Sequence, residues 1–176
     1  MQFAYDFMRS RKLADVFPES NAGAVFSSCR QYRYTLWRRW SEGATIAYIG
    51  LNPSKADEVR SDATVTRCIR RAERLGYGGM VMLNLFSFMA TDPDDMKAQA
   101  EPIGKSNDQY LLQEALAAKT VVACWGFHGE FRDRANDVLK RLREAGVVLH
   151  HLGMTKTGHP RHPSRLGYDV PLTEWK

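Results

Sequence analysis

The sequence predicts an α/β fold of three layers, in which helices cover both faces of a central, mainly parallel sheet of four strands. Two observations lead to it. Four short apolar stretches rich in β-branched residues recur along the chain, at residues 45–49, 80–85, 120–124 and 147–152. Segments with helical periodicity separate these stretches, and such alternation is typical of βαβ units that build a parallel sheet.

Three helices are expected between the strands. The first, over residues 65–75, has apolar residues spaced i, i+3, i+4, i+7 and i+10, which places them on one helix face. A second is expected over residues 106–118, with Ser106 as its N-cap. The third repeats the apolar spacing over residues 131–142, and Gly146 suits the end of that helix.

The chain is expected to form a single domain over residues 1–176, with a catalytic core at 44–168 and a peripheral N-terminal segment at 1–43. Within that segment, the run from Arg30 to Trp40 mixes basic and aromatic residues and partly alternates. It predicts a strand or hairpin that caps the core. An amphipathic edge strand is the favoured interpretation, and a phosphate-contacting edge with stacking aromatics is the alternative.

The composition predicts a cytoplasmic protein, expected to be a monomer, with a polyanionic partner such as DNA. The net charge is +5 and the pI is about 9.2, which favours such a partner only mildly. No apolar run approaches the length of a membrane span. The first residues also lack the pattern of a secretion signal.

No metal or other cofactor is expected. The three cysteines are scattered, with no C-x-x-C pair, which indicates reduced buried thiols and argues against zinc or an iron–sulfur cluster. Four histidines lie near the C-terminal end of the chain. However, the adjacent His150 and His151 would point to opposite faces of a strand, and no carboxylate or cysteine accompanies them at ligand spacing.

Polar, aromatic and glycine residues follow each predicted strand, at residues 50–54, 84–88, 125–128 and 153–166. In open α/β sheets, ligands bind beyond the carboxyl ends of the strands, so these loops predict one site. Each loop alone also has a structural interpretation. Asn52 could form an Asx turn, Asn84 could brace the backbone, and His162 could be an ordinary loop histidine.

Taken in order, the loops resemble motifs of the uracil-DNA glycosylase superfamily over residues 44–168. The segments that carry the resemblance are Gly50-Leu51-Asn52-Pro53, Val81-Met82-Leu83-Asn84, the apolar strand that ends in Trp125-Gly126, and His162-Pro163-Ser164 with Leu166 two positions later. Within that superfamily, the chain is similar to small bacterial and phage-associated proteins formerly of unknown function (DUF1643-like). The resemblance implies a glycosylase-like fold and a DNA glycosylase used in repair or antiviral defence.

The resemblance also implies roles for individual residues. Asn52 would place a water beneath the sugar C1′, because an amide is no strong base. His162 would donate a hydrogen bond to the pyrimidine O2 as charge develops on the departing base, while Asn84 would pair with the base edge. The base pocket would also include Leu51, Pro53, Ser54 and Phe86. DNA would be contacted by Lys156, Arg161, Ser164 and Arg165, with Leu166 as a wedge.

Two departures from the superfamily pattern bear on the substrate. Ser54 stands where uracil-specific members carry a tyrosine that blocks a C5 methyl, so we expect a C5-substituted pyrimidine, such as hydroxymethylated or glucosylated cytosine. No aromatic residue lies in 61–71 to stack on the base, and the candidates to replace it are Phe86, Phe88 and Phe127. Asp57 and Asp62 could supply a carboxylate for the water, although capping of the following helix is the favoured role of Asp62.

Two other function classes remain open. One is a catalytically silent module that binds nucleic acid, which the presence of both Asn52 and His162 disfavours. The other is an α/β enzyme acting on a free nucleoside or nucleotide. The basic charge and the expected wedge Leu166 favour a polymer instead. A G-x-x-x-x-G-K phosphate loop is absent, which disfavours nucleotide hydrolysis.

Overall fold

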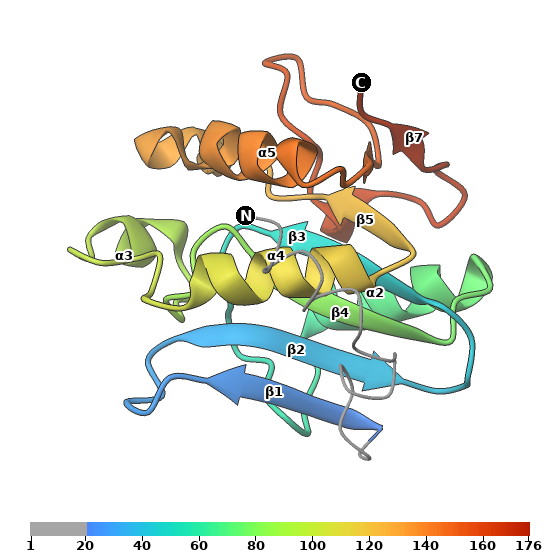
Figure 1. The fold of residues 1–176 in the computed structure, drawn as a ribbon, viewed down its shortest axis with the longest axis horizontal. Coiled ribbons are helices and arrows are strands. Elements are labelled where there is room, and N and C mark those ends of the chain that lie inside the picture. Colours follow the sequence, from blue (N-terminus) through green and yellow to red (C-terminus); the bar gives the residue numbers. More distant parts are fainter. Residues whose placement is uncertain (1–20) are drawn as a thin grey trace.

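The computed structural model describes residues 21–176, so the first 20 residues of the expected N-terminal segment lie outside the described part. Seven strands form one mixed sheet in the order β1-β2-β4-β3-β5-β6-β7 (Figure 1). They are β1 (Ala22–Phe26), β2 (Arg33–Arg39), β3 (Thr45–Gly50), β4 (Gly79–Asn84), β5 (Thr120–Ala123), β6 (Leu149–His151) and β7 (Thr173–Glu174). The α/β class was therefore confirmed, but the sheet is larger than the four expected strands and is mixed.

Parallel pairing occurs in the middle of the sheet. β3 pairs in parallel with both β4 and β5, and β5 pairs in parallel with β6. Every residue of β3 and β4 is buried, as expected of strands covered on both faces. The carboxyl ends of β3, β4 and β5 consequently lie at the same edge of the sheet.

The N-terminal strands extend the sheet instead of capping the core. β1 and β2 form an antiparallel pair, and β2 then pairs antiparallel with β4, with Leu36 opposite Met82. Six of the seven residues of β2 are buried. Because β2 lies between two strands, it has no free edge, and the predicted edge strand was wrong for this segment. The C-terminal β7, which the sequence did not predict, pairs antiparallel with β6.

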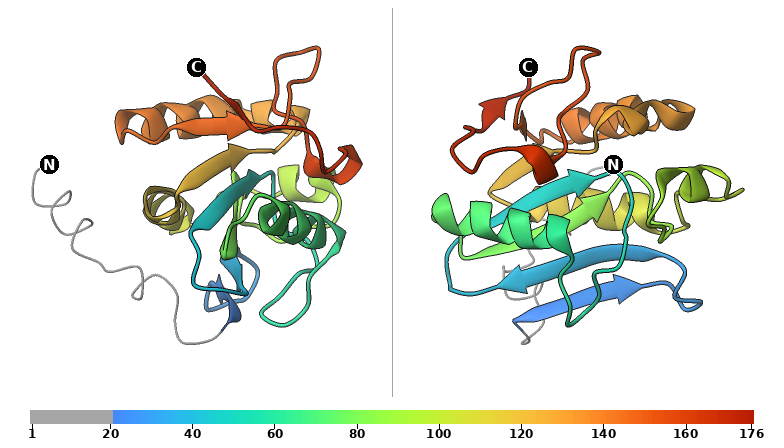
Figure 2. Two further views of the ribbon diagram at one scale, coloured as in Figure 1. Left: turned by 90° about the vertical axis from the view of Figure 1, so that its right-hand side faces the viewer. Right: turned by 180° about the vertical axis from the view of Figure 1, so that it is seen from behind.

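Helices cover both faces of the sheet (Figure 2). The helices are α2 (Ala63–Arg74), α3 (Pro93–Lys97), α4 (Asn107–Ala117) and α5 (Arg134–Glu144). α2 contributes Val65, Cys68 and Ala72 to the core on one face. α4 and α5 contribute to a second core on the other face, with residues such as Leu111 and Leu142. The sheet and the helices on its two faces therefore form the three layers that the sequence predicted.

The helix ends explain two local expectations and correct a third. Asp62 is the N-cap of α2, since its Oδ1 accepts a hydrogen bond from the Val65 amide at 2.9 Å. Gly146 follows α5 with φ of +79°, a backbone conformation that favours glycine. Ser106, in contrast, makes no capping hydrogen bond. The next side chain, Asn107, anchors the start of α4, because its Nδ2 donates to two carbonyls at the end of β4.

Candidate functional site

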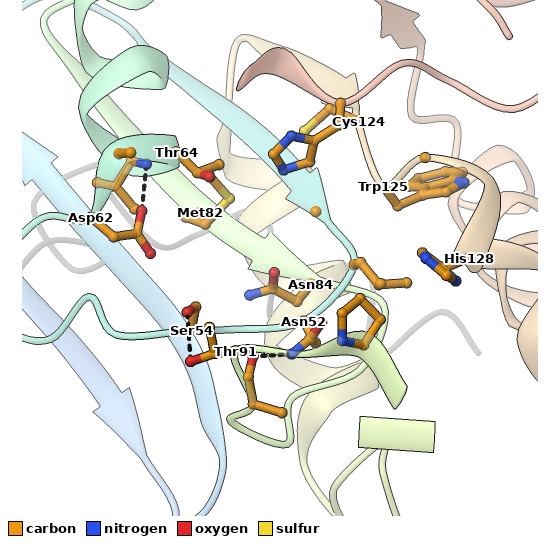
Figure 3. Close-up of a pocket in the computed structure, with 18 of the residues that line it drawn as sticks. Asn52, Ser54, Asp62, Thr64, Met82, Asn84, Thr91, Cys124, Trp125 and His128 are labelled. Atoms are coloured by element: carbon orange, nitrogen blue, oxygen red, sulfur yellow. Dashed lines mark hydrogen bonds between the residues drawn. The ribbon is translucent and has the colours of Figure 1, made fainter. Parts of the chain in front are cut away.

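A cavity of about 480 Å³ opens at the carboxyl ends of β3, β4 and β5 (Figure 3). The loops after these strands line it together with the start of α2 and one residue of β2. From the sequence-predicted site it includes Leu51, Asn52, Ser54, Asn84 and His162. Further lining residues are Arg33, Gly50, Asp62, Ala63, Thr64, Val65, Met82, Ala90, Thr91, Pro93, Cys124, Trp125, Gly126, Phe127 and His128. The structure therefore brings together loops that the sequence placed at one edge.

Asn52 is fixed by its amide group. Its Nδ2 donates hydrogen bonds to the carbonyls of Pro53 and Ala90, at 3.1 and 2.8 Å. The Pro53 carbonyl also accepts from the Ala90 amide, so the two loops are joined. Because Nδ2 is occupied by two acceptors, the atom that Asn52 can offer to a ligand or a water is the Oδ1 acceptor. Pro53 is buried beside the cavity and braces this loop without lining the cavity.

Asn84 ends β4 and is the most informative residue of the cavity. Its side chain is 3% exposed, and its Nδ2 is buried without a hydrogen-bond partner among the described residues. Gly50 allows the close approach of this side chain, since a Cβ there would lie 3.0 Å from Asn84 Oδ1. A buried donor without a partner costs free energy, and a ligand with an acceptor would satisfy it.

His162 presents one defined nitrogen to the cavity. Its Nδ1 accepts a hydrogen bond from the Ser164 amide at 3.3 Å and lies 2.9 Å from Ser164 Oγ. A neutral ring held in this way carries its hydrogen on Nε2, which is then a donor. The surrounding protein lowers the pKa of His162 below the ordinary value, although the charge of Asp62 acts in the opposite direction. Neutral His162 is therefore favoured at neutral pH.

Two arginines of α2 hold the loop that carries His162. Arg67 donates to the carbonyls of Pro163 and Leu166, at 3.3 and 2.9 Å. Arg71 is buried and donates to three carbonyls at 167–170. The sequence analysis missed both arginines, because charged residues within an amphipathic helix are usually solvated. Their contacts lie about 100 residues away along the chain, and no local pattern signals them.

An aromatic side chain stands at the cavity mouth on the β5 side. Phe127 is 54% exposed, and its ring lies on that of His128 with centroids 3.8 Å apart. Among the three expected candidates, Phe127 is the one that lines the cavity. Phe86 is 0% exposed and packs against Phe131 in the core, so its expected role in base binding was wrong. After the end of β4, Phe86 joins Leu85 in the core that also contains residues of α4 and α5.

The expected DNA contacts divide into exposed and buried residues. Lys156, Arg161, Ser164 and Arg165 are exposed and lie outside the cavity lining, where they remain available to a large ligand. Leu166 is 3% exposed and packs in the core beneath α2. This burial does not suit a wedge, and the expected wedge role of Leu166 was wrong for this conformation. Its apolar side chain serves packing instead.

The cavity is also lined by a buried arginine, Arg33, which the sequence analysis placed in a peripheral strand. Arg33 is 2% exposed, and burial lowers its pKa to about 10 while the nearby Asp62 charge opposes that shift. Its Nη1 donates to the Ala56 carbonyl. The basic-aromatic run from Arg30 to Trp40 had predicted an edge strand, and it gave no indication that one of its arginines lines the cavity.

All three cysteines are free. Cys68 and Cys124 are buried, and burial raises the pKa of both thiols. Cys29 is exposed, which corrects the expectation of three buried thiols. Within residues 21–176, no group of three or more histidine, cysteine or acidic side chains is arranged to hold a metal ion. No helix in the same described range is long and apolar enough to cross a membrane.

Comparison with known proteins assigns the chain to a protein family. No curated protein and no solved structure matches the chain. A family model described as "Protein of unknown function (DUF1643)" matches residues 33–164, which is three quarters of the chain and covers every cavity-lining residue. The chain therefore belongs to the DUF1643 family.

Proposed function

We propose that the protein is a monofunctional DNA glycosylase, which hydrolyses the N-glycosidic bond of a flipped, C5-substituted pyrimidine and leaves an abasic site. The observation that carries this proposal is the buried Asn84 Nδ2, which has no hydrogen-bond partner within residues 21–176 and lies in a cavity that Asn52 and His162 also line. A planar base carries acceptors along its edge, and one of them would satisfy this donor. The resemblance to the uracil-DNA glycosylase superfamily is part of the proposal and gives the residues their roles.

The reaction divides between two side chains. The Oδ1 of Asn52 accepts a hydrogen bond from the attacking water, because its Nδ2 is already used by two carbonyls. The water oxygen bonds to C1′ while the C1′–N bond breaks, and the electron pair leaves with the base. His162 Nε2–H donates to the pyrimidine O2, where negative charge collects. One proton of the water finally ends on the released base, so atoms and charge balance.

A polymer substrate is favoured over a free nucleoside by charge. Exposed basic residues lie on the loop that carries the cavity residue His162, namely Arg161 and Arg165. Such residues contact phosphates and position a nucleic acid without reading its sequence. The buried Leu166 removes one earlier reason to exclude a free nucleoside, so nucleosides belong in the test. A silent binding module remains the other alternative.

The proposal is tested with labelled DNA duplexes that contain uracil, a thymine mismatch, 5-hydroxymethylcytosine or its glucosylated form, next to the free nucleosides. Alkali cleaves the DNA wherever an abasic site has formed. We expect cleavage of a duplex with a C5-substituted base, lost in Asn52→Ala and His162→Ala. Lys119→Ala, at an exposed position outside the cavity, serves as the matched control. Tight DNA binding without any cleavage would instead favour the silent module.

A further inference from the structure

Two charged side chains line the cavity without a role in the proposed hydrolysis. Arg33 comes from the first position of β2, and Asp62 is the residue that caps α2. In the view of Figure 3, Asp62 and Ser54 lie on one side of the cavity and His128 on the other, with Asn84 in between. A base whose edge meets Asn84 would therefore have Asp62 near its far side, where Ser54 leaves room, and Arg33 lines the same cavity.

The Arg33 guanidinium has a donor, Nε–H, that makes no hydrogen bond within the described residues. Its side chain is 2% exposed, and its Nε is buried without a partner among the described residues. Among residues 21–176, its guanidinium donates from Nη1 to the Ala56 carbonyl. A buried guanidinium N–H without an acceptor is costly, more so than a neutral donor. This part of the cavity therefore favours a ligand atom that accepts a hydrogen bond.

Asp62 offers a hydrogen-bond acceptor in the same cavity. Both side chains line the same cavity, and the charge of Asp62 acts on Arg33, yet no ion pair or hydrogen bond joins the two within residues 21–176. Oδ1 of Asp62 accepts from the Val65 amide, which leaves Oδ2 as an acceptor for a ligand. The cavity thus offers a donor, Arg33 Nε–H, and an acceptor, Asp62 Oδ2, and no hydrogen bond between them occurs in the described residues.

A hydroxyl group matches this arrangement, because it donates one hydrogen bond and accepts others. A methyl group would leave the Arg33 donor unpaired, and a carboxylate would face the negative charge of Asp62. The cavity volume of about 480 Å³ falls within the range of about 300–1,000 Å³ of small-molecule sites. A pyrimidine ring together with a substituent therefore has room.

We propose that Arg33 and Asp62 form a subsite for a hydroxyl-bearing substituent at C5 of the pyrimidine, and so determine specificity. This inference rests on the proposed function, because the orientation of the base follows from it. Arg33 Nε–H donates to the substituent oxygen, and the hydroxyl donates to Asp62. The two residues touch the substituent and take no part in bond cleavage.

The first test measures binding of free bases to the full chain by titration calorimetry, which requires no catalysis. The probes are 5-hydroxymethylcytosine, 5-methylcytosine and 5-carboxycytosine. We expect the hydroxymethylated base to bind at least about tenfold more tightly than the methylated one, as for hydrogen bonds to charged groups. Equal binding of these two bases, or preference for the carboxylated base, overturns the inference.

The second test uses variants. Asp62→Asn keeps an oxygen that can cap α2, so the helix is retained while the charge is removed. Arg33→Gln removes the guanidinium. Both are expected to reduce the preference for hydroxymethyl over methyl toward one, and the Asn variant keeps the test decisive if Arg33→Gln does not fold. Glu58→Gln, in the same loop but outside the cavity lining, is expected to keep the preference.

The outcomes separate this inference from the proposed function. Preferential binding of the hydroxymethylated base without release of any base from DNA supports the subsite and contradicts the glycosylase. Release of bases from DNA at equal rates for methyl and hydroxymethyl supports the glycosylase and contradicts the subsite. An unchanged preference in Asp62→Asn contradicts the role of that carboxylate.

Discussion

Replacement of Asn84 by leucine is expected to abolish base release without weakening the fold. The two side chains branch at the same atom, and Asn84 Nδ2 has no hydrogen-bond partner to lose within the described residues. A buried donor left unsatisfied costs about 1–3 kcal/mol, so its removal should leave the free energy of unfolding unchanged or raise it by up to about that amount. Residues kept at such a cost are typical of functional sites.

Asn107 provides the matched control, since it is a second buried asparagine close by. Its Nδ2 donates to the carbonyls of Asn84 and Leu85, both at 3.0 Å. Asn107→Leu leaves two buried carbonyls with fewer donors, although Arg134 still donates to that of Leu85. Asn107 Oδ1 is itself buried without a partner among the described residues, which offsets part of this loss, so we expect the free energy of unfolding to fall by about 1 kcal/mol or more.

The assay is urea denaturation followed by the fluorescence of the four tryptophans, together with base release from a labelled duplex. The expected pattern is opposite in the two variants: Asn84→Leu is stable and inactive, and Asn107→Leu is destabilised. A loss of more than about 1 kcal/mol in Asn84→Leu would refute the reasoning, because Asn84 would then have a structural partner.

Three further predictions concern the cavity walls. Asp62→Ala removes the cap of α2 and should lower the free energy of unfolding by about 1 kcal/mol in urea, whereas Asp62→Asn should lower it less. Base release should be full above pH 6.5 and decline as the pH falls through the lowered pKa of His162, because protonation places a hydrogen on the Nδ1 that accepts from Ser164. A decline that already begins above pH 6.5 contradicts this role. Phe127→Ala should weaken base binding by about 1–3 kcal/mol through lost stacking, with unchanged stability, and calorimetry would detect the opposite pattern if Phe127 were structural.

Local patterns in the sequence were sufficient for the strands and helices that position the cavity. The apolar stretches at 45–49 and 120–124 coincide with β3 and β5, and the spacing from Val65 onward matches α2. Asp62 capping was also confirmed, because an N-cap depends on neighbours within one turn. Each of these features depends on residues that are close in the sequence, so the sequence pattern alone predicts it.

The errors concern partners distant in the sequence. The alternation in β2 resembles an edge strand, but its pairing with β4 places it inside the sheet. Phe86 lies beyond the end of β4, where strand alternation no longer applies, and it packs in the same core as the adjacent Leu85. Leu166 was assigned from a motif, whereas its burial depends on contact with α2. Arg33 was missed for the same reason, since the loop that brings Ala56 to it is 23 residues away.

The most direct measurement of the central claim is mass spectrometry of the small molecules released from an unlabelled duplex containing 5-hydroxymethylcytosine. The account predicts free 5-hydroxymethylcytosine in an amount equal to the abasic sites formed, and none with Asn52→Ala or His162→Ala. Release of a nucleoside or nucleotide, or of no base from any modified duplex by well-folded protein, would contradict it.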